Sequence, residues 1–255
     1  MDAPKPALTA SPMMLALLAL PVLPIGGAIG WAWHSSGSDP ASGLAKGERA
    51  AIEAVVKDYI LTHPEILPQA MENLQARENA KQLSGIRKEL ETPFPGAILG
   101  NPAGTVTLVE FTDFACTYCR QSAADVEELV RTNPDLKVVI REFPILSPQS
   151  ADAAKMGLAA ARQGKYAAFH RLMFAAGRPD QAAIEAAAKA AGVDLAKARA
   201  AIASPDMEAE LVRNVTLARQ LGFTGTPSWV VGDAVLSGAV GKDRLAEAIA
   251  AAGKS

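Results

Sequence analysis

Between residues 48 and 91, apolar side chains recur every three or four positions, the spacing that places them on one face of a helix. The first stripe ends before "THPE" at 62–65, where Pro64 suits the first turn of a new helix. A second stripe continues to about Leu90. The stripes consist of Ile52, Val55, Val56, Tyr59 and Ile60, then Leu67, Met71, Leu74, Leu83, Ile86 and Leu90. They predict a helical arm over 48–91, which either holds copies of the chain together or folds onto its own domain.

The pattern changes after residues 92–104, a connector rich in Pro and Gly. "TVTLVEFTDF", from Thr105 to Phe114, is dense in β-branched and aromatic residues and predicts a buried strand. The next twenty residues, "ACTYCRQSAADVEELVRTNP", predict a helix, and "DLKVVIREF" at 135–143 predicts a second strand. Strand, helix and strand in such close succession indicate a βαβ unit whose strands pair in parallel.

Alanine dominates the rest of the chain, and 51 of the 255 residues are Ala. Because Ala is the strongest helix former, we expect residues 149–220 to be helical. "PSWVVG" and "AVLSG" then predict two short strands that turn at Gly232-Asp233, and residues 241–252 predict a closing helix. The main domain, residues 105–255, is therefore expected to be an α/β fold with the order βαβ, helical block, ββα.

The N-terminal segment has a different character. No Asp, Glu, Lys or Arg occurs between Pro6 and Ser38, and residues 13–33 are apolar enough to span a bilayer. Trp31 and Trp33 are typical of a membrane interface, so we expect an uncleaved anchor; a cleaved signal peptide and a buried helix are the alternatives. Either form of export places the remaining chain outside the cytoplasm. The segment is flanked by a tail, residues 1–12, and by a flexible linker, residues 34–47.

Charge and cysteine content exclude two classes of protein. The net charge is −2 and the sequence pI is about 6.0, which argues against a protein that binds nucleic acid through its overall charge. Only two cysteines are present, so the chain is not a disulfide-stapled scaffold.

Those cysteines occur as Cys116-Thr117-Tyr118-Cys119, directly after the first predicted strand and at the start of the helix. A helix N-terminus has free N–H groups and partial positive charge, and both stabilise a thiolate. Because the thiolate is the nucleophile of disulfide exchange, Cys116 is predicted to attack and Cys119 to resolve the mixed disulfide. A structural zinc site is one alternative, but it needs four ligands and the three histidines are scattered, so we expect no metal.

Several stretches resemble the DsbA-like thioredoxin-fold thiol–disulfide oxidoreductases. They are "GNPAGTVTLVEFTDFACTYCR" at 100–120, the helical block and "GFTGTPSWVVG" at 222–232. "IEAVVKDYILTHPEILPQAMENLQ" resembles the N-terminal arm of the ScsC-like branch, the suppressor-of-copper-sensitivity proteins. The resemblance implies a thioredoxin-like fold with a helical subdomain inserted at about 150–220.

The resemblance also implies roles for three residues outside the cysteine pair. Thr226-Pro227 matches the family's cis-proline loop, which packs beside the sulfurs and presents its backbone to an extended substrate peptide. Glu110, six residues before Cys116, matches the family's buried acid, which would relay the proton of Cys119. An edge or outward-facing strand residue is the alternative for Glu110.

The residues between the cysteines depart from the family pattern. Many strongly oxidising relatives carry Pro-His there, whereas this chain has Thr117-Tyr118. A His can become cationic and stabilise the neighbouring thiolate, but the phenol of Tyr is neutral near pH 7. Thr117 and Tyr118 are therefore expected to tune the pair, and the choice between oxidase and isomerase stays open.

We expect an exported thiol–disulfide oxidoreductase that acts on cysteine-containing exported proteins. It would need no cofactor besides the redox-active Cys116–Cys119 disulfide, and a membrane or periplasmic redox partner would recycle it. We also expect that the chain can form a homo-oligomer through residues 48–91. We expect no nucleic-acid partner. The alternative function is a non-catalytic, membrane-tethered module that binds a thiol partner or a metal.

Overall fold

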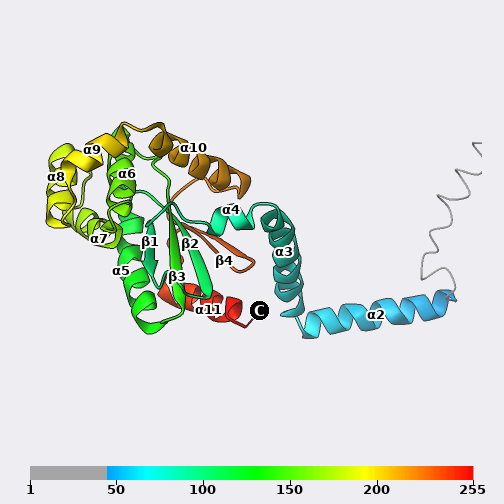
Figure 1. Cartoon of the computed structure of the whole chain (residues 1–255). Helices are drawn as coiled ribbons and strands as arrows, with labels where there is room; N and C mark the ends of the chain where they lie inside the picture. Colours follow the sequence, from blue (N-terminus) through cyan, green and yellow to red (C-terminus); the bar gives the residue numbers. More distant parts are fainter. Residues whose placement is uncertain (1–44, 255) are drawn as a thin grey trace, which may run out of the picture. The chain divides into compact units, whose positions relative to one another are not determined.

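The computed structural model describes residues 45–254 (Figure 1). The predicted tail, the hydrophobic segment 13–33 and nearly all of the linker lie outside the described residues. The contacts divide the chain into two units, residues 1–64 and 65–255. No helix among residues 45–254 combines the length and the apolar character that crossing a bilayer requires.

The described part of the first unit is one helix, α2 (Lys46–Thr62). Its N-terminus is capped by Glu48, whose carboxylate accepts a hydrogen bond from the Ala45 N–H at 3.0 Å. The predicted apolar stripe lies on one side of this helix, and four of its five residues are 48–68% exposed. These four are Ile52, Val55, Val56 and Tyr59.

Among the described residues, five strands form one sheet in the order β1-β3-β2-β4-β5. Parallel pairing of β2 with β3 confirms the predicted βαβ unit, and the other three pairs are antiparallel. β1 was not expected, because its three residues lie in the predicted connector and are too few to show a strand pattern. The strands are Ile98–Gly100, Val106–Thr112, Leu136–Glu142, Ser228–Val231 and Ala234–Ser237.

Alternate residues of the central strands face two separate cores, as the two-residue period of a strand requires. Leu108 and Ile140 face the core that contains α5, α7 and α11. Val109 and Val139 face the core on the side of α4 and α10. The sheet therefore lies between two helical layers (Figure 1). The bounds of the flanking helices are Thr117–Thr132 for α5, Pro205–Gln220 for α10 and Lys242–Ala252 for α11.

The predicted helical insertion is confirmed between β3 and β4. Besides α10 it contains α6 (Pro148–Ala161), α7 (Tyr166–Ala176), α8 (Gln181–Ala190) and α9 (Leu195–Ile202). Ser147 and Asp180 cap the N-termini of α6 and α8 with their side-chain oxygens. The buried side of α7 carries aromatic residues into the first core, directly beside the cysteine-bearing helix α5.

The second half of the predicted arm is two helices instead of one. α3 (Ile66–Ser84) and α4 (Arg87–Glu91) are separated at Gly85, although the apolar spacing continues across it. Leu83 and Leu90 are fully buried in the core that contains Val109 and Val139. Residues 65–91 therefore pack on the sheet domain, and the predicted arm 48–91 is divided after Pro64.

A buried arginine fixes the end of α4 to the sheet. Arg141 on β3 donates hydrogen bonds to the carbonyls of Leu90 at 3.0 Å and Thr92 at 2.6 Å. It also forms an ion pair with Glu210 of α10 at 2.9 Å, in which both side chains are nearly inaccessible. Since removing one partner of a buried pair leaves a costly charge, this cluster makes α4 an integral part of the domain.

Candidate functional site: a cysteine pair at a helix N-terminus

The cysteine pair lies at the start of α5, directly after β2. Cys116 is the N-cap residue, and its sulfur accepts a hydrogen bond from the Cys119 N–H at 3.4 Å. The Cys116 N–H donates to the Asp113 carbonyl at 2.9 Å, which closes the turn between strand and helix. Both thiols are free; Cys116 is 6% exposed and Cys119 is 0% exposed. Cys116 is thus the more accessible sulfur, as an attacking thiol must be.

The Thr226-Pro227 loop comes from a distant part of the sequence and lies against Cys116. β4 pairs with β2 antiparallel, with Ser228 opposite Phe111, so the residues before β4 meet those after β2. The Thr226 carbonyl accepts a hydrogen bond from Cys116 Sγ at 3.3 Å, and the Thr226–Pro227 peptide bond is cis. The fold therefore brings together the two motifs that lie more than 100 residues apart in the sequence.

Hydrogen bonding and burial give the two thiols opposite proton affinities. The hydrogen bond from the Cys119 thiol lowers the pKa of Cys116 to about 5, against burial and with help from Thr226 and the N–H groups of Cys119 and Tyr118. Burial raises the pKa of Cys119 above its usual range, and the hydrogen bond to Cys116 and the charge of Glu110 add to the rise. At neutral pH the pair holds a thiolate at Cys116 and a thiol at Cys119.

Glu110 lies fully buried on the sheet face that α5 covers, between Ile140 on β3 and Trp229 on β4. Burial raises its pKa to about 8, opposed by the Thr112 hydroxyl and reinforced by the charge of Cys116. An outward-facing position for Glu110 is therefore wrong. Its carboxyl is mostly protonated at neutral pH and adjoins the cysteine pair.

The side chains of the two residues between the cysteines do not account for the lowered pKa of Cys116. Tyr118 is 61% exposed, and the Thr117 hydroxyl accepts a hydrogen bond from Arg120 at 3.4 Å. Within the described residues, no cationic side chain contributes to the lowered pKa of Cys116, which comes from the Cys119 thiol, the Thr226 side chain and N–H groups.

Sequence reasoning missed three polar residues beside the site: Asp113, Glu142 and Tyr166. The Asp113 carboxylate accepts hydrogen bonds from three N–H groups in the turns after β2 and β3. The Tyr166 hydroxyl donates to Glu142 Oε1 at 2.7 Å, in the same core as the cysteines. The only available signal was a charged residue at the end of a strand predicted to be buried, because the register that brings Glu142 to the site is not visible in the sequence.

Residues 45–254 contain no group of three His, Cys, Asp or Glu side chains placed to hold a metal ion. His170, one of the three histidines of the sequence, is buried among aromatic rings of α7 and Phe114. Burial lowers its pKa to about 4, so it is neutral at physiological pH.

The sheet, the inserted helices and the position of the cysteines define a class: the thiol–disulfide oxidoreductases of thioredoxin fold. The chain belongs to the family of DSBA-like thioredoxin domains, which matches residues 107–250. Residues 48–81 match the copper resistance protein ScsC N-terminal domain. That match takes in most of α2 and of α3, and so includes residues of both units.

Solved structures show the same similarity. A thioredoxin-like oxidoreductase from Silicibacter pomeroyi is 39% identical, covers 66% of this chain and 98% of its own, and has a TM-score of 0.63. ScsC from Proteus mirabilis in a transitional conformation is 28% identical, with 84% and 100% coverage and a TM-score of 0.63. The thiol-disulfide exchange protein alpha-DsbA2 from Wolbachia pipientis is 26% identical, with 71% and 97% coverage and a TM-score of 0.63.

Curated relatives match over a shorter stretch. The Na(+)/H(+) antiporter NhaA 1 of Mycobacterium sp. (strain KMS) is 39% identical over 82 residues, which is 31% of this chain and 13% of the antiporter. The matched stretch is thus a small part of that protein, and ion transport is not inferred for this chain.

Proposed function

We propose that the chain is a periplasmic thiol–disulfide oxidoreductase that acts on the cysteines of exported proteins through Cys116 and Cys119. The observation that carries the proposal is the Cys116 sulfur, which lies at a helix N-terminus, 3.3 Å from the Thr226 carbonyl, with its pKa lowered to about 5. A low pKa makes the thiolate available at neutral pH and also makes Cys116 a good leaving group. The periplasmic location is supported by a similar periplasmic thioredoxin-like protein of Salmonella enterica, 26% identical.

The exchange proceeds in two balanced steps. In the reduced protein the Cys116 thiolate attacks a substrate disulfide, forms a mixed disulfide and releases one substrate thiolate. Cys119 then loses its proton and attacks Cys116 Sγ, which forms the Cys116–Cys119 disulfide and releases the second substrate thiolate. Oxidation of a substrate dithiol is the reverse. A membrane or periplasmic partner restores the starting form after each cycle, and no further cofactor is required.

Glu110 serves as the proton donor and acceptor for Cys119. Its raised pKa keeps it protonated at neutral pH, so it is ready to protonate Cys119 when that sulfur leaves during substrate oxidation. Thr226 and Pro227 present their backbone to an extended substrate peptide, which adds beside the sulfurs as a strand would.

Replacing each cysteine by Ser tests the assignment. Cys119→Ser should trap mixed disulfides with substrate proteins, because the resolving thiol is missing, whereas Cys116→Ser should abolish exchange and trap nothing. The readout is non-reducing electrophoresis after acid quenching of a periplasmic extract. Trapping by Cys116→Ser instead would reverse the roles. Wild-type protein that neither oxidises nor reshuffles a scrambled substrate would favour the non-catalytic thiol- or metal-binding module.

The reduction potential of the cysteine pair decides between oxidase and isomerase. For a two-electron couple, about 30 mV changes the equilibrium tenfold. Equilibration with glutathione buffers therefore places the pair on the oxidising or the reducing side of its substrates.

The apolar stripe of α2 supports assembly of several copies. Four of its residues are 48–68% exposed, and the stripe lies within the stretch that matches the ScsC N-terminal domain. Active sites joined in this way would raise the local thiol concentration at one client into the millimolar range. That arrangement suits repeated attack on a wrongly paired substrate, and hence isomerase activity.

Light scattering on the chain released from residues 1–42 tests the assembly. Val56→Asp should give monomers at tens of micromolar, since a charge in the stripe opposes burial. Ala54→Asp, on the opposite side of the same helix, is the matched control and should leave the oligomer intact. A monomeric wild type under these conditions would reject α2 as the assembly element.

The N-terminal segment provides the proposed route out of the cytoplasm. Residues 13–33 would tether the chain to the membrane, with the cysteine pair on the outer side. N-terminal sequencing of the protein from carbonate-washed membranes separates an anchor from a cleaved signal peptide, since only the anchored form keeps these residues and resists the wash.

A further inference from the structure

One buried face of the sheet carries a row of oxygen atoms that have no hydrogen-bond partner within the described residues. They are Glu110 Oε1 and Oε2, Thr112 Oγ1 and Glu142 Oε2. Buried polar atoms are almost always hydrogen-bonded, so several unpaired oxygens in neighbouring positions point to a use. Glu110 and Thr112 lie on the same face of β2, and Thr112 is directly opposite Glu142 of β3. The ladder thus lines up three side chains from Glu110 to Glu142.

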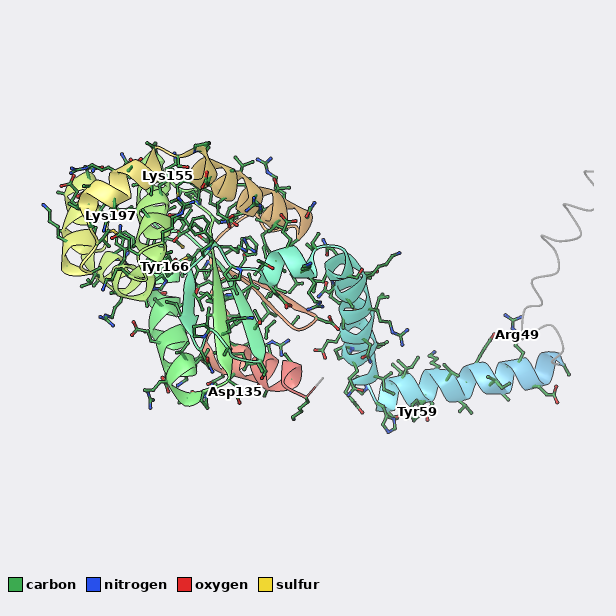
Figure 2. The ribbon with its side chains drawn as sticks, viewed as in Figure 1. Arg49, Tyr59, Asp135, Lys155, Tyr166 and Lys197 are labelled. Carbon is green, nitrogen blue, oxygen red and sulfur yellow. The ribbon has the colours of Figure 1, made fainter. Side chains whose placement is uncertain are left out.

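Glu142 is held at the end of this line by two helices. Tyr166, labelled in Figure 2 at the start of α7, donates to Glu142 Oε1 at 2.7 Å. Gly157 of α6 leaves the space that the pair needs, because a Cβ there would lie 3.0 Å from Glu142 Oε1 and 3.4 Å from the Tyr166 ring. Gly is a poor helix former, so its position inside α6 needs a reason. The space that it leaves for the Glu142–Tyr166 pair provides one.

The groups that face Glu142 favour its neutral form. Burial raises the pKa of Glu142 well above its usual range; the Tyr166 hydroxyl opposes this shift, and the charges of Asp113 and Glu110 add to it. Burial likewise raises the pKa of Tyr166, and the charges of Glu142 and Glu110 add to that rise. Tyr166 therefore stays protonated at neutral pH, and the surroundings of Glu142 favour its protonated form.

Among residues 45–254, no cationic side chain contributes to the pKa of Glu142. His170, also on α7, is neutral because burial lowers its pKa to about 4. Arg141 precedes Glu142 in β3, but it faces the opposite side of the sheet and pairs with Glu210 at 2.9 Å. The surroundings of Glu142 thus favour its protonated form, and in that form its hydroxyl can donate a hydrogen bond along the line of oxygens.

We propose that Glu142 is a positioning residue for proton transfer at Cys119: oriented by Tyr166, its protonated carboxyl donates to the Thr112 hydroxyl, which in turn donates to Glu110 and stabilises the carboxylate formed there. The inference rests on the proposed function and adds a second buried acid to it. The three groups are already aligned before reaction, and their contacts shorten when charge appears on Glu110, as catalytic hydrogen bonds commonly do.

The three groups Glu142, Thr112 and Glu110 act together when a substrate thiolate attacks the disulfide of the oxidised protein. The substrate sulfur bonds to Cys116 Sγ, the Cys116–Cys119 bond breaks, and its electron pair passes to Cys119. Glu110 gives its proton to the Cys119 sulfur and becomes a carboxylate. Thr112 and Glu142 keep their protons and donate hydrogen bonds toward the new negative charge. The buried carboxylate of Glu110 is therefore not left without a hydrogen-bond donor.

Single-turnover oxidation of a one-cysteine peptide by the oxidised full chain, followed across pH, tests the proposal. Glu110→Gln should slow formation of the free Cys119 thiol about 100-fold. Glu142→Met, which keeps the side-chain length but removes the donor, should slow it about tenfold, equivalent to about one pKa unit at Glu110. Glu142→Gln keeps an N–H donor and should stay close to wild type. Thr112→Val should match Glu142→Met, and Thr112→Ser should match wild type.

A double variant and a control separate this role from a structural one. Glu110→Gln combined with Glu142→Met should be no slower than Glu110→Gln alone, because Glu142 acts through Glu110. Glu210→Gln removes a buried acid on the other sheet face; it should lower the stability of the fold, because it breaks the ion pair with Arg141, but leave the rate and its pH profile unchanged. In all variants the Cys116 thiolate should titrate as in wild type. If Glu142→Met does not fold, the comparison of Thr112→Val with Thr112→Ser tests the proposal by itself.

Three outcomes would overturn the inference: a wild-type rate for Glu142→Met or Thr112→Val, equal slowing by Glu142→Gln and Glu142→Met, or a double variant slower than Glu110→Gln by the full factor of the single change. A wild-type rate for Glu110→Gln would instead remove Glu110 from the proposed function. A slow Glu110→Gln with a fast Glu142→Met removes only the second acid, so the two failures are distinguishable.

Discussion

Cys116 and Cys119 belong to the same helical turn, yet their surroundings move the pKa values of their thiols in opposite directions. Cys116 accepts an N–H and contacts the Thr226 carbonyl, whereas Cys119 is sealed in the core. Hydrogen bonds to Cys116 and the burial of Cys119 therefore divide reactivity between two chemically identical side chains. The accessible sulfur attacks, and the buried sulfur resolves.

The lowered pKa of Cys116 makes the stability of the reduced protein depend on pH. Absorbance at 240 nm should report a thiolate with a midpoint at about 5. The thiolate stabilises the fold fully above the unfolded-state pKa, near 8.5, and this contribution disappears as pH falls through about 5. Denaturant unfolding of reduced wild type and of Cys116→Ser should therefore show a stability difference that grows from about pH 4 to about pH 8.5. A difference that is constant with pH would contradict the assignment.

Tyr118 offers a direct way to tune the pair. Its side chain is 61% exposed, so Tyr118→His should not disturb the core. An imidazolium beside the thiolate should lower the pKa of Cys116 further and raise the reduction potential, by about 30 mV for each tenfold change in equilibrium. Equilibration with glutathione measures the potential, and Tyr118→Phe serves as the uncharged control. Equal potentials for the two variants would show that this position does not act through charge.

The sequence was informative about the cysteines and uninformative about their support. The C-x-x-C pair and Thr226-Pro227 are contiguous motifs, so they can be recognised from the sequence alone. Glu142 and Tyr166 occur singly, 24 residues apart, and become a pair only through strand register and the packing of α7. Burial also decided what the sequence left open at Glu110.

At the scale of elements, α3 and α4 show how an apolar stripe can serve two purposes. Leu67, Met71 and Leu74 are 53–72% exposed, whereas Leu83 and Leu90 are fully buried. The spacing of these residues is the same in both halves, which is why periodicity did not reveal the boundary. The carbonyls at the end of α4 are bound by Arg141, a partner about 50 residues away that no local pattern indicates.

Truncating one leucine from each half of the stripe should separate the two roles. Leu83→Ala should destabilise the domain by about 2–5 kcal/mol, the usual cost of a large-to-small change in a core. Leu74→Ala, on the same helix and 58% exposed, should change stability by less than about 0.5 kcal/mol. Denaturant unfolding measures both. Equal effects would mean that α3 is not docked as described.

The length of a strand decides whether the sequence pattern can predict it. β2 and β3 are seven residues long and rich in β-branched residues, and both were predicted nearly at their observed bounds. β1 has three residues and forms only because β3 offers it a free edge. An element of that length has no signal of its own, because its existence depends on its partner.

At the scale of the whole molecule, the site of truncation should determine whether the remaining chain is stable. A chain that starts at Glu65 keeps the whole second unit and should unfold cooperatively with its redox activity intact. A chain that starts at Gly96 loses Leu83, Leu90 and the carbonyls that bind Arg141. Its free energy of unfolding should fall by more than the roughly 2–5 kcal/mol that a single core Leu→Ala change costs, and its melting temperature should fall with it. Similar melting curves for both chains would show that α3 and α4 contribute little.

The pairing of β2 with β4 has a consequence for how the protein is made. The Cys116 sulfur and the Thr226 carbonyl that contacts it are 110 residues apart in the chain. At ribosomal speeds of about 5–20 residues per second, the cysteines precede their loop by on the order of ten seconds. During that interval the nascent chain carries two thiols without Thr226, whose side chain helps to lower the pKa of Cys116 in the folded protein. Full nucleophilicity thus arrives only after β4 has been synthesised and has paired with β2.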